Sequence, residues 1–127
     1  METDPTRPSF GRYGSALVAV EDERAALASV LVLQEMGFSV DIARDHAAAL
    51  AWAGRATYAV VICGTGDAQR STQFAIRIRF CAPQTRVLLL TDPAVAPEAL
   101  DEIGIELLAA PIDVNMLVER LWPAEAE

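Results

Sequence analysis

The chain has 127 residues, of which 53% are hydrophobic, and a formal net charge of −8 at pH 7. This length and composition predict one globular domain with a proper core, and no apolar run approaches the roughly 18–20 residues of a membrane span. The negative charge argues against nucleic acid as a direct partner, because phosphate would be repelled.

The N-terminal third begins with a tail and continues into a strand and a helix. Residues 1–14 mix Pro, Gly, Ser, Thr and charge without periodicity, which predicts a flexible segment. A short apolar strand is expected at 15–20. After the acidic cluster at 21–23, a helix rich in Ala and Leu should run to Met36, where Gly37 ends it.

The middle of the chain repeats this alternation and contains its most apolar stretch. A second strand is expected at 38–43, followed by a helix that Asp45 caps and Gly54 ends. The run YAVVICGTG at 58–66 reads as a strand buried on both faces, ending at Cys63 and opening into a glycine-rich loop.

Two further strands and three helices complete the pattern. A helix is expected at 71–81, a buried strand at 86–91, a short helix at 97–103 and a strand at 105–109. Asp113 then caps the last helix, and the domain should extend over residues 15–122, with a tail at 123–127. The side chains expected to face the core from the 71–81 and last helices are Phe74, Ile76 or Ile78, Cys81, Met116, Leu117, Leu121 and Trp122.

Strands that alternate with helices at this spacing require parallel pairing with right-handed crossovers. We therefore predict an α/β fold, a flavodoxin-like doubly wound sheet of five parallel strands in the order 2-1-3-4-5, with helices on both faces. In such a sheet the functional site lies at the carboxyl ends of the strands.

That edge is predicted to collect Glu21, Asp22, Cys63, Thr91 and the turn at 109–111. Two carboxylates at a strand end suggest a Mg²⁺ site, since this ion prefers one or two carboxylates plus water. The alternative is that both residues cap the first helix and are solvated. His46, in the first turn of the next helix, is expected to be solvated and not a ligand.

From Ala16 to Leu121 the chain resembles the receiver domain of two-component response regulators. LVAVEDE matches the first strand of that family and its acidic pair, so Glu21 and Asp22 fall on the metal-binding carboxylates. YAVVIC matches the third strand, whose last residue is the phospho-accepting aspartate; by this match the position is Cys63. VLLLT matches the fourth strand, so Thr91 falls on the hydroxyl that senses the phosphoryl group.

The match to the fifth strand, ELLAAP, exposes further departures from the family. Its Lys-Pro turn is Ala110-Pro111 in this chain, and the aromatic switch position is Leu107. Phosphoryl transfer needs a carboxylate nucleophile, a divalent metal and a cation that neutralises developing charge. All ten basic residues are arginine, so no lysine can substitute. The resemblance implies a degenerate receiver, or pseudo-receiver, that is not phosphorylated, not an enzyme, and binds Mg²⁺ weakly at most through Glu21 and Asp22.

Cys63 supports a second hypothesis, a redox or thiol sensor. Reactivity needs a thiolate, and the expected neighbours Glu21 and Asp22 should raise the pKa of the thiol; the competing interpretation is a small buried hydrophobe. Cys63 and Cys81 form no disulfide framework and, with one histidine, no zinc pattern, so a reduced, cytoplasmic protein is expected. A third hypothesis, a small ligand or nucleotide at the strand edge, is weaker because GxGxxG and GKS/T spacings are absent.

The charge is unevenly distributed. Residues 92–127 contain nine acidic residues and one Arg, whereas residues 68–87 contain four Arg and no acid. In receivers the face formed by the fourth helix, fifth strand and fifth helix carries signalling contacts. The expected partner face consists of Glu98, Asp101, Glu102, Glu106, Asp113 and Glu119. Such a face disfavours a symmetric homodimer and favours a basic partner or the arginine-bearing side of another copy; the alternative is that these charges only solvate the surface.

The leading hypothesis is therefore a phosphorylation-independent signalling module of a bacterial-type two-component pathway. It would act by binding a signalling protein and would require no cofactor.

Overall fold

The computed structural model describes residues 14–92, 94 and 98–126, without the side chains of Glu98 and residues 122–126. Apart from Gly14, the N-terminal tail expected at 1–14 lies outside the described residues. Within the described part, no helix is long and apolar enough to cross a membrane.

Strands and helices alternate along the whole described chain. Their order is β1 (Ser15–Val20), α1 (Glu23–Glu35), β2 (Ser39–Ile42), α2 (His46–Arg55), β3 (Val60–Gly64), α3 (Ala68–Cys81), β4 (Arg86–Thr91), the 3₁₀ helix η3 (Glu98–Ile103), β5 (Ile105–Ala109) and α4 (Val114–Ala126).

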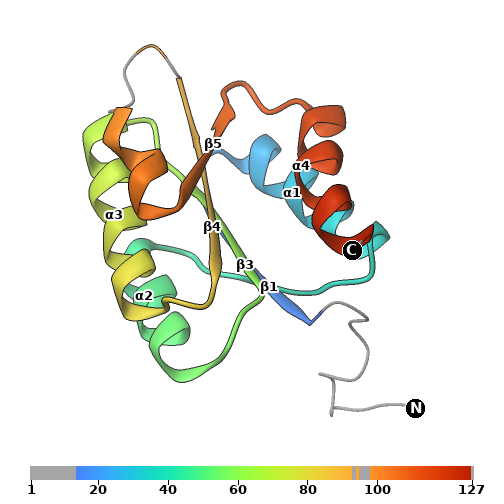
Figure 1. Cartoon of the computed structure of the whole chain (residues 1–127), viewed down its shortest axis with the longest axis horizontal. Coiled ribbons are helices and arrows are strands. Elements are labelled where there is room, and N and C mark those ends of the chain that lie inside the picture. The colour runs from blue at the N-terminus through green and yellow to red at the C-terminus, as the bar shows by residue number, and fades with distance from the viewer. Residues whose placement is uncertain (1–13, 93, 95–97, 127) are drawn as a thin grey trace.

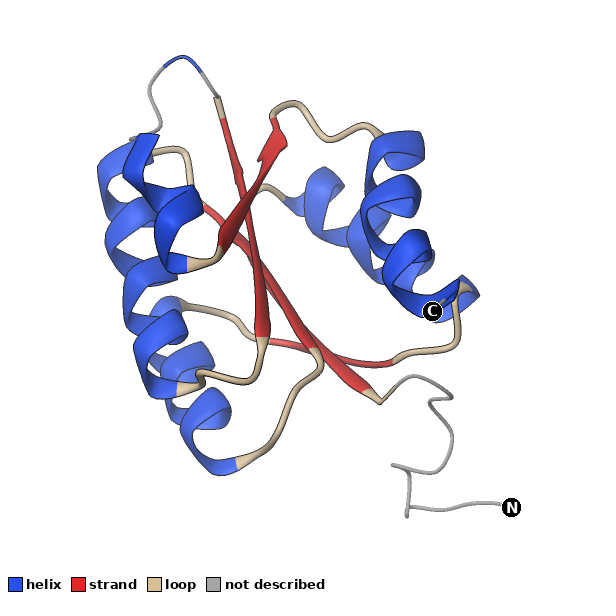
Figure 2. Ribbon diagram, viewed as in Figure 1, coloured by secondary structure: helices blue, strands red, loops and turns tan. Residues whose placement is uncertain are grey.

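The five strands form one sheet in the order β2-β1-β3-β4-β5, and every pair is parallel. Helices α2, α3 and η3 cover one face of the sheet, and α1 and α4 cover the other (Figure 1). The same two-sided arrangement is visible with strands and helices coloured separately (Figure 2). The predicted fold class and strand order are confirmed.

Successive strand residues face opposite sides of the sheet, so the core has two halves. Val61 and Cys63 lie in the cluster with α2 and α3. Val60 and Ile62 lie in the cluster with α1 and α4. All four side chains are 0–2% exposed, which explains why β3 reads as an uninterrupted apolar run.

Aspartates begin the first three helices. The carboxylates of Asp22, Asp45 and Asp67 accept hydrogen bonds from backbone N–H groups in the first turns of α1, α2 and α3. Because Asp67 caps α3, this helix starts at Ala68 and not at Ser71 as expected.

Several boundaries and orientations differ from the prediction. Gly54 lies inside α2, which ends at Arg55, because a glycine in a helix is tolerated at a cost of about 1 kcal/mol. Cys81 is exposed because the buried residues of α3 follow a stripe through Ser71, Phe74, Ala75 and Ile78, and that stripe reaches position 82 next.

The last helix also differs from the prediction. It continues to Ala126, past residue 122, since Ala and Glu in this segment favour helix. Met116 is 42% exposed, because the buried stripe of α4 follows the spacing of Leu117 and Leu121. The side chain of Trp122 lies outside the described residues.

Candidate functional site

The last residue of β3 is Gly64, one residue beyond the expected Cys63. The prediction that Cys63 lies at the carboxyl edge is therefore wrong. Its side chain is 0% exposed among the residues packed against α2 and α3, with Sγ 3.7 Å from the carbonyl oxygen of Leu88. Burial alone, not neighbouring carboxylates, raises the pKa of the Cys63 thiol to about 12. This removes the basis for a thiol sensor at Cys63.

Gly64 occupies the end of β3, and it has no room for a side chain. A Cβ at this position would lie 2.7 Å from the carbonyl oxygen of Leu90 and 3.2 Å from its Cβ. The obstacle is backbone of the neighbouring strand β4, which cannot rotate away. The edge of the sheet thus carries neither a carboxylate nor a thiol at this point.

The acidic pair at the end of β1 is divided between two structural roles. Oε1 of Glu21 accepts a hydrogen bond of 2.9 Å from the backbone N–H of Gly66. Oδ2 of Asp22 accepts one of 2.9 Å from the N–H of Ala25 and caps α1, as the alternative interpretation proposed for it. Among the described residues, no three His, Cys, Asp or Glu side chains are placed to hold a metal ion together.

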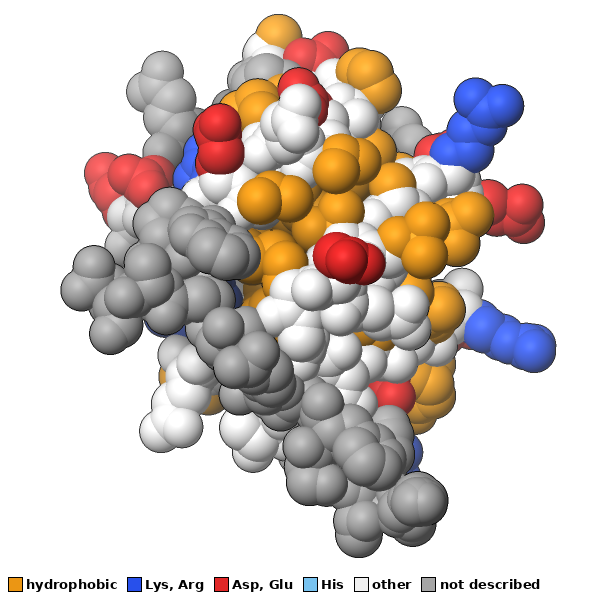
Figure 3. All heavy atoms as spheres, turned by 90° about the vertical axis from the view of Figure 1, so that its right-hand side faces the viewer, with side chains coloured by type: hydrophobic (Ala, Val, Ile, Leu, Met, Phe, Trp, Pro, Cys, Tyr) orange, Lys and Arg blue, Asp and Glu red, His pale blue; other side chains and the backbone are white. Residues whose placement is uncertain are grey.

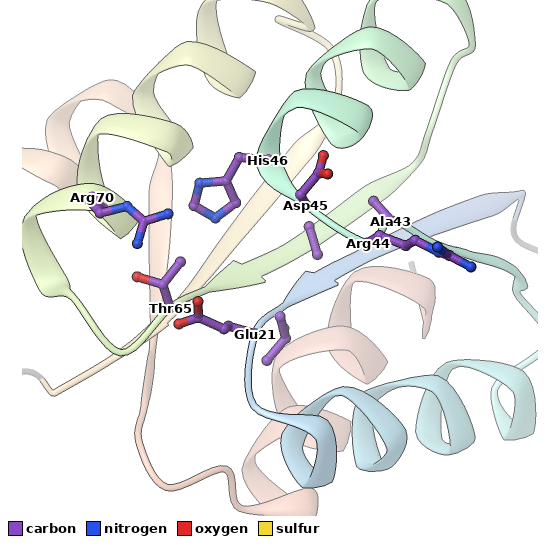
Figure 4. A pocket seen from close by; sticks show the side chains of 9 residues that line it. Glu21, Ala43, Arg44, Asp45, His46, Thr65 and Arg70 are labelled. Carbon is purple, nitrogen blue, oxygen red and sulfur yellow. The ribbon is translucent and has the colours of Figure 1, made fainter.

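Glu21 lines a small hollow of about 150 Å³ between β1, α2 and the start of α3. Figure 4 shows its carboxylate beside Thr65, with His46 and Arg70 on the opposite wall. The His46 ring stacks on Phe74, with ring centroids 3.9 Å apart and planes inclined by 10°. His46 is half-buried and not solvated as expected. Burial is the main cause that lowers the pKa of His46, and the Arg70 charge is the second. The charges of Glu21 and Asp45 act in the opposite direction, and the net shift is downward.

Asp22 lines a different and larger hollow, a cleft of about 960 Å³ on the α1 and α4 side of the strand ends. Thr91, Ala110 and Pro111 line it as well, so the structure brings three of the predicted positions together with Asp22, and Gly64 joins them. The Ala110-Pro111 peptide bond is cis, and the Ala110 N–H donates to the carbonyl oxygen of Thr91 at 3.0 Å.

Two positions in the cleft lack the groups that phosphoryl transfer requires. Thr91 presents a hydroxyl, but the residue at the end of β3, Gly64, supplies no carboxylate, and Ala110 supplies no cation beside Pro111; the described charged residues that line the cleft are Asp22, Arg24 and Asp92. Leu107 is half-buried on β5, opposite Leu89 of β4, and is not among the residues that line the cleft.

Only some of the acidic residues expected on the partner face are free of contacts within the fold, among those whose side chains are described. Glu106 accepts hydrogen bonds of 2.5 and 2.8 Å from the Arg86 guanidinium, and it lies 3.7 Å from Nη1 of Arg120. Asp113 caps α4 through the N–H of Asn115 at 2.9 Å. These two carboxylates serve the fold. Other described acidic side chains of this set are exposed and neither cap a helix nor pair with an arginine. They are Asp101, Glu102 and Glu119.

An exposed apolar surface was not expected from the sequence. Figure 3 views the molecule from the side of α1 and α4, and hydrophobic side chains gather on this face. The large exposed hydrophobic residues of the two helices are Leu27 (59%), Leu31 (56%), Val114 (45%) and Met116 (42%). Leu27 and Leu31 are spaced by one helical turn, so the pair could have been recognised as one stripe. Because α1 is apolar on nearly all sides, its sequence did not show which of its residues face the core and which face outward.

Neither a protein-family model nor a curated protein matches the sequence. Solved structures do match, and those similar to the chain are mainly response regulators and receiver domains. A response regulator from Thermotoga maritima is 23% identical, with a TM-score of 0.72 over 89% of this chain and 98% of that one. The chemotaxis response regulator CheY4 of Vibrio cholerae is 27% identical, with a TM-score of 0.63 over 86% and 97%.

A third similar structure is described as an adenylate cyclase from Rhodopirellula baltica. It is 18% identical, with a TM-score of 0.65 over 86% of this chain and 85% of that one. The neighbours thus give this chain the receiver fold and support a module of two-component signalling.

Proposed function

We propose that this protein is a pseudo-receiver, a receiver-like signalling module that acts by binding another protein and is not controlled by aspartyl phosphorylation. The observation that carries the proposal is Gly64 at the end of β3. The family's acceptor is the last residue of this strand, and glycine has no group that could accept a phosphoryl group.

Three features around Gly64 support the loss of phosphorylation. The Leu90 carbonyl oxygen occupies the space that any Cβ at position 64 would need. One oxygen of Glu21 and one of Asp22 accept hydrogen bonds from the backbone of Gly66 and Ala25, and no third described ligand lies with them. Ala110 stands where the family has its lysine. Each feature alone would weaken phosphoryl transfer, and together they remove the nucleophile and the cation and leave at most two carboxylates for a metal ion.

The surface formed by Leu27, Leu31, Val114 and Met116 supports a protein partner. Exposed apolar side chains that gather on one face mark interaction sites more often than scattered ones do. Helices α1 and α4 pack against each other, so these residues belong to one side of the molecule (Figure 3). We place the partner contact on this side, in preference to the acidic set, in which Glu106 and Asp113 are already engaged.

The proposal is tested by affinity capture with the immobilised full chain in a lysate of its own organism, with and without acetyl phosphate and Mg²⁺. We expect the same partner in the same amount under both conditions. The double variant Leu27→Gln/Leu31→Gln should lose this partner.

Phe80→Gln is the matched control, because Phe80 is 72% exposed but lies on α3, on the opposite face of the sheet. Capture that depends on acetyl phosphate would contradict phosphorylation independence. Capture that the α1 double variant retains and the Phe80 variant loses would contradict the proposed surface.

A further inference from the structure

The cleft at the carboxyl edge is a candidate ligand site in its own right, although it shares Val114 with the proposed partner surface. Its volume of about 960 Å³ lies at the upper end of the roughly 300–1,000 Å³ typical of small-molecule sites. Residues at or just after the ends of β1, β3, β4 and β5 line it, as expected at the switch point of a doubly wound sheet.

Small residues keep the cleft open. Gly64 and Gly66 line it from the β3 end, Ala25 and Ala28 from α1, and Ala110 from the turn after β5. None of these side chains extends beyond one carbon, so nothing from these positions fills the space.

The walls are mainly apolar. Besides the alanines, the apolar lining residues are Val20, Leu90, Pro111, Ile112 and Val114. An apolar wall around a few polar groups is the usual composition of a site for an organic ligand.

One polar group in this wall has no partner. Thr91 is 6% exposed and lines the cleft, and within the described part of the chain its hydroxyl makes no hydrogen bond. Native proteins rarely leave a buried hydroxyl without a hydrogen-bond partner, so water or a bound molecule in the cleft would satisfy this one. An acceptor atom on a bound molecule would satisfy it.

The charges at the rim decide the class of ligand. The carboxylates of Asp22 and Asp92 already accept hydrogen bonds from the N–H groups of Ala25 and Ala94. Arg24 is the one basic side chain among the described lining residues, and the chain carries a net charge of −8. A nucleotide or other phosphate would meet too little positive charge, and an inorganic cation would meet no cluster of three ligands.

We propose that this cleft binds an uncharged, largely apolar organic molecule of about two fused rings that carries a carbonyl or similar acceptor for the Thr91 hydroxyl. The molecule would lie over Gly64, between α1 and the turn that contains Ala110. Its apolar rings would pack against Leu90, Ile112 and Val114.

The probe for the test is the neutral fluorophore prodan, a naphthalene that carries a ketone and a dimethylamino group. Titration of the full chain should give a saturable blue shift of its emission with one site per chain. In ¹H–¹⁵N spectra, the amide signals that shift should be those of Gly64, Gly66, Thr91 and Ala110.

Variants locate the site. Ala28→Leu adds bulk to the cleft wall on α1 and should weaken binding at least tenfold. Ala51→Leu, the same change on the exposed side of α2, should leave binding unchanged. Thr91→Val removes only the hydroxyl and should weaken binding about three- to tenfold, the effect of one hydrogen bond. Thermal unfolding followed by circular dichroism confirms that each variant is folded.

Two results would overturn the proposal. The first is the absence of saturable binding by the folded wild-type chain up to the solubility of the probe. The second is binding that Ala28→Leu leaves unchanged, or shifts confined to Leu27 and Leu31 on the outer face of α1.

Discussion

Gly64→Ala adds a single carbon at the position where β3 meets the Leu90 carbonyl group of β4. The new Cβ would lie 2.7 Å from that oxygen, so the two strands must move apart. Overpacking of this kind costs about 1–3 kcal/mol. The loss of unfolded-state freedom on replacing glycine offsets about 0.4–1 kcal/mol of it. We therefore expect the free energy of unfolding to fall by about 1–2 kcal/mol, which urea titration followed by circular dichroism measures.

Two other glycines provide matched controls for the same change. Nothing lies within 4 Å of a Cβ built on Gly54 in α2, so Gly54→Ala should raise the free energy of unfolding by about 0.5–1 kcal/mol. At Gly66 the nearest atom is Oε1 of Glu21 at 3.8 Å, an ordinary contact, and Gly66→Ala should change stability by less than about 0.5 kcal/mol. A Gly64→Ala protein as stable as Gly54→Ala would refute the claim that no side chain fits at position 64.

Three further predictions concern position 64, His46 and the two cysteines. Gly64→Asp should destabilise at least as much as Gly64→Ala and, without a cation at position 110, should gain no phosphoryl group from acetyl phosphate, as intact mass would show. The folded-state pKa of His46 is lowered, so the unfolded state binds more protons below 6.5 and stability should fall as the pH drops from 7.5 to 5.5; a His46→Gln protein with the same pH slope would contradict this. Maleimide should label Cys81 and not Cys63 in the native chain, and both in urea, since Cys63 is buried and Cys81 exposed; equal native labelling would disprove the burial.

The fold could be predicted because each element carries its own signal. Apolar runs mark the strands, and aspartates such as Asp22 and Asp45 mark the helix starts. Parallel pairing then follows from the alternation of strands and helices, and the strand order from the doubly wound class.

The sequence analysis placed the end of β3 at Cys63, one residue before the observed Gly64, and this error has a physical reason. A strand buried on both faces shows no alternation, so its pattern does not mark where it ends or which side its last residue faces. A shift of one residue moves a side chain to the opposite face of the sheet. Cys63 therefore belongs to the core under α2 and α3, while Gly64 belongs to the cleft. The conclusion drawn from Cys63, that the family's acceptor is missing, applies equally to Gly64.

Contacts between residues far apart in the chain also could not be predicted from the sequence. Arg86 and Glu106 are 20 residues apart and meet because β4 and β5 are neighbours in the sheet. The resemblance to receivers and the charge distribution had placed Glu106 on a partner surface. The His46–Phe74 stack depends in the same way on how α2 packs against α3.

The central claim is that no acyl phosphate forms at the carboxyl edge of this sheet. Incubation of the wild-type chain with acetyl phosphate and Mg²⁺, followed by intact mass spectrometry, tests it most directly. The account predicts an unchanged mass. A stoichiometric phosphoryl adduct that is stable to acid and labile to base would contradict it.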